Sequence, residues 1–83
     1  MRGRMRERVS RADRVDALLK ASLRVAGRQL PITIIDMSDR GCKIRCLEVL
    51  PVGEVVELVI PAFQPSAATI RWSLAGMAGL RFI

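Results

Sequence analysis

The sequence contains no histidine, and this absence narrows the chemistry open to the chain. Histidine is the commonest general base in enzymes, the commonest metal ligand, and a member of the Ser-His-Asp and Cys-His nucleophile arrangements. The eight acidic residues are scattered over candidate turns and strand faces, and no two of them form an evident acid–base couple. We therefore expect a binding protein and not an enzyme, with no catalytic residue, no metal site and no resident cofactor.

Cysteine and aromatic residues are also scarce. Cys42 and Cys46 are the only cysteines. On one strand their Cα atoms would lie about 13 Å apart, too far for a disulfide or for a shared metal ion. We therefore expect two small core residues in a reducing compartment. The chain has one Trp, two Phe and no Tyr, and we expect Trp72 and Phe82 to point into the core.

Long uncharged segments are missing as well. No uncharged run reaches the roughly 18 residues that a spanning helix needs, so we expect no membrane span. The N-terminus is charged throughout, which is unlike a secretory signal, and we expect a cytoplasmic protein. At 83 residues, 51% hydrophobic and 27% charged, the chain suits one small globular domain.

Positive charge is concentrated near the N-terminus. The formal net charge is +6, and residues 1–14 hold six arginines against two acidic residues. Arginine presents a planar fork of donors that matches phosphate groups and guanine edges. This basic arm, residues 1–14, indicates an anionic partner such as a nucleotide, a nucleic acid or a lipid head group, and a solvated tail is the alternative.

After the arm, apolar and polar residues alternate in short segments, as is typical of β-strands. The alternation predicts six strands, at residues 17–25, 31–35, 42–46, 55–60, 68–72 and 79–83. A helix over residues 13–25 is the competing interpretation, because Ala, Leu, Lys and Arg favour helices. We prefer the strand because Ala26-Gly27-Arg28 looks like a hairpin tip.

Turn signals separate these segments at residues 36–41, 51–54, 61–66 and 73–78. A chain this short satisfies the edges of six strands best by closing its sheet. The prediction is an all-β fold: a small six-stranded antiparallel β-barrel over residues 15–83, preceded by the flexible basic arm.

The turn at residues 36–41 has the pattern D-x-S-x-x-G between two predicted strands. Downstream, Ile70-Arg71-Trp72 and Gly79-Leu80-Arg81-Phe82 would form a closing strand pair, and the arginine-rich arm leads into the first strand. Features in this order resemble the PilZ domain, a family of six-stranded β-barrels that bind the bacterial second messenger cyclic di-GMP. The resemblance covers about residues 8–83 and implies both the fold and the ligand.

The resemblance also implies a site made of the D-x-S-x-x-G loop and arginines of the arm. The family carries R-x-x-x-R just before its first strand. Here Arg14 stands about where the second arginine belongs, but Ser10 occupies the position four residues earlier. Strict spacing occurs only further out, at Arg2/Arg6 and Arg4/Arg8. The residues expected to bind cyclic di-GMP are Arg8, Arg11, Arg14, Asp36, Ser38 and Gly41.

The chemistry of the ligand suits these residue types. Arginine can bond guanine O6 and N7 or clamp phosphate oxygens, and Asp36 would accept from guanine N1–H and the N2 amine. Ser38 can donate to a phosphate, and Gly41 would let the chain turn without a Cβ. A turn closed by its own Asp and Ser side chains is the alternative interpretation. Arg71 and Arg81 should point outward, either near the arm or simply into solvent.

Two other functions stay open. A nucleic-acid-binding barrel of the OB or Sm type would use the same arm, but such proteins stack bases on exposed aromatic residues, and Trp72 and Phe82 are expected inside. A degenerate PilZ-like module would bind a protein and no cyclic di-GMP. Under the main interpretation the arm is mobile without ligand, becomes ordered with it, and passes the signal to an unidentified downstream protein.

Overall fold

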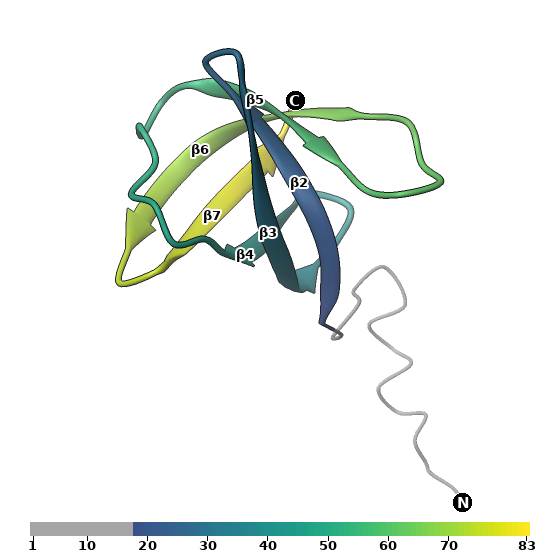
Figure 1. Ribbon diagram of the computed structural model, residues 1–83, viewed down its shortest axis with the longest axis horizontal. Coiled ribbons are helices and arrows are strands. Elements are labelled where there is room, and N and C mark those ends of the chain that lie inside the picture. The colour runs from purple at the N-terminus through teal and green to yellow at the C-terminus, as the bar shows by residue number, and fades with distance from the viewer. Residues whose placement is uncertain (1–17) are drawn as a thin grey trace, which may run out of the picture.

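The computed structural model describes residues 18–83, which form a closed β-barrel (Figure 1). Its strands are β2 (Leu19–Val25), β3 (Arg28–Met37), β4 (Gly41–Arg45), β5 (Val55–Val59), β6 (Ser66–Leu74) and β7 (Met77–Phe82). All neighbours pair antiparallel in the order β2-β3-β4-β7-β6-β5, and β5 closes the circle by pairing with β2. The predicted six-stranded antiparallel barrel is confirmed, and the basic arm lies outside the described residues.

The core is built from the inward-facing residue of each alternating pair. Its largest fully buried side chains are Leu23, Ile34, Ile44, Leu58 and Ile70, which come from five different strands. Branched aliphatic side chains pack well on a pleated surface, which explains why these short segments form strands. Cys42 and Cys46 are buried free thiols in the same cluster, as expected, and Phe82 packs against it.

The prediction that Trp72 points into the core is wrong. The pairing of β6 with β7 shifts between Ile70 and Trp72, so that Arg71 is the extra residue of a β-bulge. An extra residue reverses which face each later side chain occupies. Trp72 is therefore 40% exposed, and its indole lies over Gly79 of β7, where a Cβ would overlap the ring.

Two of the turns are shorter than the sequence predicted. Strand β3 continues through Met37, so the turn before β4 contains only residues 38–40. Strands β6 and β7 extend to Leu74 and from Met77, and only Ala75 and Gly76 join them. Both of these residues have positive φ angles, of 53° and 78°. Such angles on both residues suit a tight two-residue hairpin, which lets the strands run further than alternation alone suggested.

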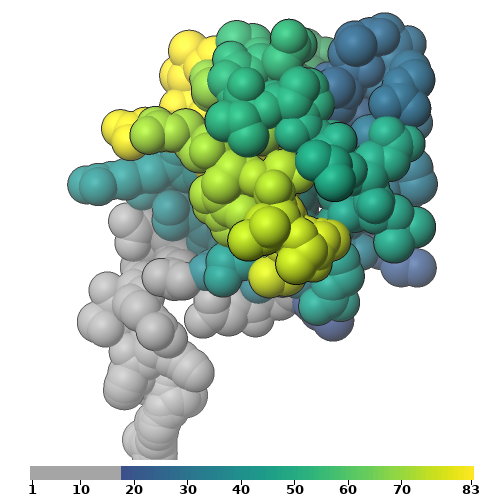
Figure 2. All heavy atoms as spheres, turned by 90° about the vertical axis from the view of Figure 1, so that its left-hand side faces the viewer, coloured from purple at the N-terminus to yellow at the C-terminus, as the bar shows by residue number. Residues whose placement is uncertain are grey.

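The connection from β4 to β5, residues 46–54, packs along the β6–β7 hairpin (Figure 2). Cys46 N donates to Gly76 O at 2.9 Å, and Leu50 N donates to Ser73 Oγ at 2.9 Å. Leu50 is buried, which anchors the connection to the core. Within residues 18–83 no helix is long and apolar enough to cross a membrane.

Candidate functional site

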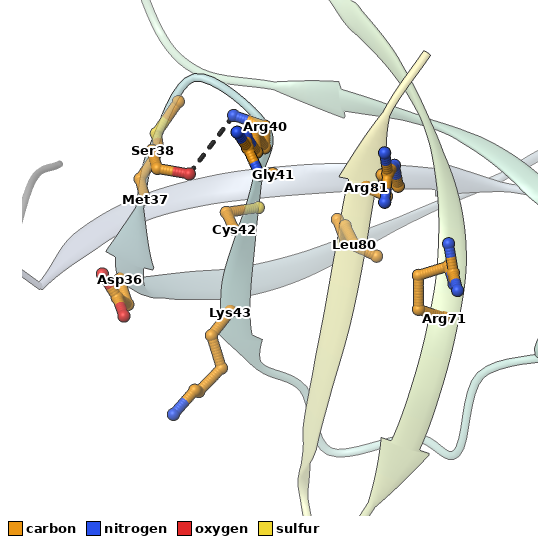
Figure 3. Close-up of a pocket in the computed structure, with 10 residues that line it drawn as sticks. All are labelled: Asp36, Met37, Ser38, Arg40, Gly41, Cys42, Lys43, Arg71, Leu80 and Arg81. Atoms are coloured by element: carbon orange, nitrogen blue, oxygen red, sulfur yellow. Dashed lines mark hydrogen bonds between the residues drawn. The ribbon is translucent and has the colours of Figure 1, made fainter. Parts of the chain in front are cut away.

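A pocket of about 440 Å³ lies beside the turn between β3 and β4 and extends across β7 to β6 (Figure 3). The pairing of β4 with β7 brings the turn between β3 and β4 beside the last strand there. Its lining consists of Asp36, Met37, Ser38, Arg40, Gly41, Cys42, Lys43, Arg71, Leu80 and Arg81. The pocket thus contains the three predicted site residues of the loop, together with residues from the last two strands.

Asp36 reaches this surface because of a second β-bulge. The pairing of β3 with β4 shifts between Ile34 and Asp36, which leaves Ile35 as the extra residue. Without it Asp36 would share the inward face of Ile34. With it Asp36 lies opposite the exposed Lys43, and Met37 lies opposite the buried Cys42 and packs against the core. The bulge therefore aims the carboxylate outward and anchors the next residue inside.

The negative charge of Asp36 also acts on the thiol beneath it. Burial, and secondarily the charge of Asp36, raise the pKa of Cys42 to about 12. The thiol therefore stays protonated over the physiological range and behaves as a small core residue.

Ser38 closes the turn that carries the motif. Its backbone N–H donates to Gly41 O at 2.9 Å, and Arg40 N donates to Ser38 Oγ at 3.2 Å (Figure 3). This is the self-closed turn that the sequence left as an alternative for Ser38. The hydroxyl is an acceptor in that bond, so its own proton can still be donated to a ligand. The turn and a binding role are therefore compatible.

Gly41 has a different structural role from the one predicted. It begins β4 and its φ is not in the left-handed region, so freedom to turn is not the reason for glycine here. A Cβ at Gly41 would overlap the carbonyl oxygen of Leu80 on β7. Phe82 N also donates to Arg40 O at 2.8 Å across the same junction. Glycine thus permits close contact between β4 and β7, which holds the motif turn beside Arg81.

Four basic residues line the pocket but were not among the site residues predicted from the sequence. Arg71 and Arg81 were expected outward with two possible environments, and Arg40 and Lys43 were not considered. Alternation already put Lys43 and Arg81 on the outer face, and an antiparallel pairing of their strands would have grouped them. All four basic residues line the same pocket, and Asp36 is the one acidic residue among the described residues of its lining.

These basic groups lack acidic partners among the described residues. Elsewhere on the barrel Arg24 pairs with Glu57 at 2.9 Å, and Arg28 forms a fork with Glu48 at 2.8 and 3.2 Å. Neither pair borders the pocket, and within residues 18–83 the pocket's four basic side chains make no ion pair. The resulting positive potential favours an anionic ligand.

The remaining predicted site residues, Arg8, Arg11 and Arg14, lie outside the described residues. Among residues 18–83 there is also no cluster of three or more side chains that could hold a metal ion. The described half of the predicted site is therefore a turn with an acidic and a hydroxyl group, surrounded by arginine and lysine.

Comparison of the sequence with models of known protein families finds a match. The family model described as the PilZ domain matches residues 6–83, which is nearly the whole chain. No curated protein and no solved structure matches the sequence.

Proposed function

This chain belongs to the PilZ domain family, and from that premise we propose that its barrel is a receptor and adaptor module for cyclic di-GMP. The observation that carries the proposal is the pocket in which Asp36 and Ser38 lie among four basic side chains. A cyclic dinucleotide needs both kinds of group, because it carries two phosphodiester charges and two hydrogen-bonding bases. Binding without catalysis also agrees with a chain that has no histidine.

In this proposal the carboxylate of Asp36 recognises one guanine base of the ligand through hydrogen bonds. Guanine presents N1–H and the N2 amine side by side, and a carboxylate accepts from both. Adenine presents an acceptor at N1 and no N2 amine, so the same carboxylate repels it. The Ser38 hydroxyl and the basic side chains then contact the phosphodiesters.

The basic arm completes the site in the same proposal. Arg8, Arg11 and Arg14 contact the ligand from outside the barrel, and the arm becomes ordered as they do so. Ordering each backbone residue costs about 1–2 kcal/mol, so affinity should be moderate. The position of the ordered arm then reports occupancy to a downstream protein. Backbone NMR relaxation on free and saturated protein tests this step, because an arm equally rigid in both states would contradict it.

Calorimetric titration with cyclic di-GMP, cyclic di-AMP and GTP tests the binding itself. Asp36→Ala should weaken binding of cyclic di-GMP by about 1.5–3 kcal/mol, the value of hydrogen bonds to a charged group. Asp39→Ala is the matched control, because Asp39 is an exposed acid of the same turn that does not line the pocket. Unchanged affinity in Asp36→Ala, or equal losses in both variants, would contradict the assignment of this loop.

One observation favours a second candidate function, the binding of single-stranded nucleic acid. Trp72 was expected inside, but it is exposed and lies across Gly79 from Lys43 on the outer face. An exposed indole beside basic residues is a surface on which bases stack. Titration with single-stranded RNA at several salt concentrations tests it, since neutralised phosphates give a steep salt dependence.

A further inference from the structure

Arg71 and Arg81 border a second pocket as well as the first. This second pocket has a volume of about 430 Å³. Its lining consists of Val52, Gly53, Thr69, Ile70, Arg71, Arg81, Phe82 and Ile83. Of residues 18–83, only these two arginines line both pockets. They therefore form a basic ridge with a pocket on each side.

The strand register explains why the two arginines stand together. Arg81 on β7 lies opposite Thr69 on β6, and Arg71 follows two residues later on the same strand. Arg71 is the extra residue of the bulge, and both arginine side chains are exposed and line the same two pockets, which places them on one face of the sheet. Figure 3 shows both arginines on the neighbouring strands. Neither has an ion pair within the described residues, so a bound anion would relieve the repulsion between them.

The two pockets differ in their ability to read a base. The first contains Asp36, which can distinguish guanine from adenine. Among the described residues no acidic side chain lines the second pocket, whose lining includes the aliphatic Val52 and Ile83 and the aromatic Phe82. A flat base can pack against such a surface, but nothing in the lining demands the N1–H and N2 amine of guanine.

We propose that Arg71 and Arg81 form a phosphate clamp that a single cyclic dinucleotide straddles, with one base in each pocket. Only the base beside Asp36 is read as guanine. The site is therefore asymmetric, and it accepts the mixed cyclic dinucleotide that carries one guanine and one adenine as well as cyclic di-GMP. The inference rests on the proposed function, and it adds a ligand class and a second subsite to it.

Competition among three probes tests the asymmetry, with the full chain and calorimetric readout. Cyclic di-GMP and 3′,3′-linked cyclic GMP-AMP should bind with affinities within about threefold, and cyclic di-AMP should bind at least about tenfold more weakly. If cyclic di-GMP binds but the mixed ligand is as weak as cyclic di-AMP, both bases are read, and the inference fails while the proposed function stands. If cyclic di-GMP does not bind, both fail.

Charge removal at the ridge tests the clamp. Arg71→Gln and Arg81→Gln should each weaken cyclic di-GMP and the mixed ligand alike, by about tenfold, because each loses a charge-assisted contact to phosphate. Arg45→Gln is the matched control, since Arg45 is an exposed arginine of β4 that lines neither pocket. Equal affinity in all three variants and the wild type would overturn the clamp.

A negative charge placed in the second pocket tests the second subsite. Ile83 lines that pocket and is 78% exposed, so Ile83→Glu should leave the fold intact and weaken binding. Val49→Glu is the control, because Val49 is 81% exposed and lines neither pocket. Binding of cyclic di-GMP that is unaffected by Ile83→Glu would overturn the straddling arrangement.

Discussion

The buried thiol of Cys42 links the protonation of one residue to the stability of the barrel. Burial and the neighbouring Asp36 raise its pKa from an ordinary value of 9.0 to about 12. Between these two values the unfolded chain releases a proton that the folded chain retains. The unfolding free energy therefore falls as pH rises through this window. Well below pH 9 the thiol is protonated in both states, and its contribution to the unfolding free energy does not change with pH.

We expect urea unfolding to reveal this linkage. From pH 9 to pH 10 the wild type should lose about 1 kcal/mol more unfolding free energy than Cys42→Ala, because the thiol of the unfolded wild type goes from half to nearly fully ionised over this interval. The comparison uses the slope against pH, because the cavity left by the substitution lowers stability equally at every pH. Parallel slopes in the two proteins would show that Cys42 is not protected from ionisation.

Gly79 lies in direct contact with the indole of Trp72, so the effect of a substitution at Gly79 depends on whether the indole is present. We expect Gly79→Ala to lower the unfolding free energy by about 1–3 kcal/mol, because its methyl group would overlap the indole of Trp72. In a Trp72→Ala background the same change should cost much less, since the ring is gone. A double-mutant cycle from denaturant unfolding measures the coupling, and strictly additive effects would contradict the contact.

At the scale of the strand, alternation predicted all six strands but neither of the two bulges. A bulge adds a residue to one strand relative to its partner, so it depends on a register that the strand's own sequence does not contain. Each bulge nevertheless changes the site: the one at Ile35 turns Asp36 outward, and the one at Arg71 exposes Trp72. The error on Trp72 therefore arose from partner register and not from residue type.

The connection between β4 and β5 depends on a hydroxyl of the neighbouring hairpin. Ser73→Ala removes the acceptor of Leu50 N in a partly buried position, and we expect it to lower the unfolding free energy by about 1–2 kcal/mol. Ser66→Ala, at the exposed start of the same strand, should have little effect. Equal thermal unfolding midpoints for the two variants would show that water replaces the lost hydrogen bond to Leu50 N without a cost in stability.

At the scale of the molecule, the candidate site combines parts that the sequence keeps far apart. The D-x-S-x-x-G turn was predicted because it is local, whereas its meeting with Arg71 and Arg81 requires β4 to pair with β7. Sequence alternation gives the face of each residue but not the neighbour of each strand. The acidic and hydroxyl half of the site was thus predictable, and the basic half of the barrel surface was not.

The basic arm gives a prediction at the same scale. We expect Arg14→Ala to weaken nucleotide binding more than Arg4→Ala, because Arg14 is much closer in sequence to the first strand. The effect of Arg4→Ala should fade as salt rises, since distant exposed charges are screened. Calorimetry at low and high salt measures both, and equal losses at high salt would instead identify the outer R-x-x-x-R pair as the binding signature.

The closed order of the strands limits how this domain can be recognised by another protein. In residues 18–83 every strand has a hydrogen-bonded neighbour on both sides, because β5 returns to β2. Within the described residues a binding partner therefore finds no strand with one edge wholly free, on which it could add a strand of its own. We therefore expect recognition to use mainly side chains and turns, whose arrangement the proposed nucleotide would alter while the backbone of the barrel stays unchanged.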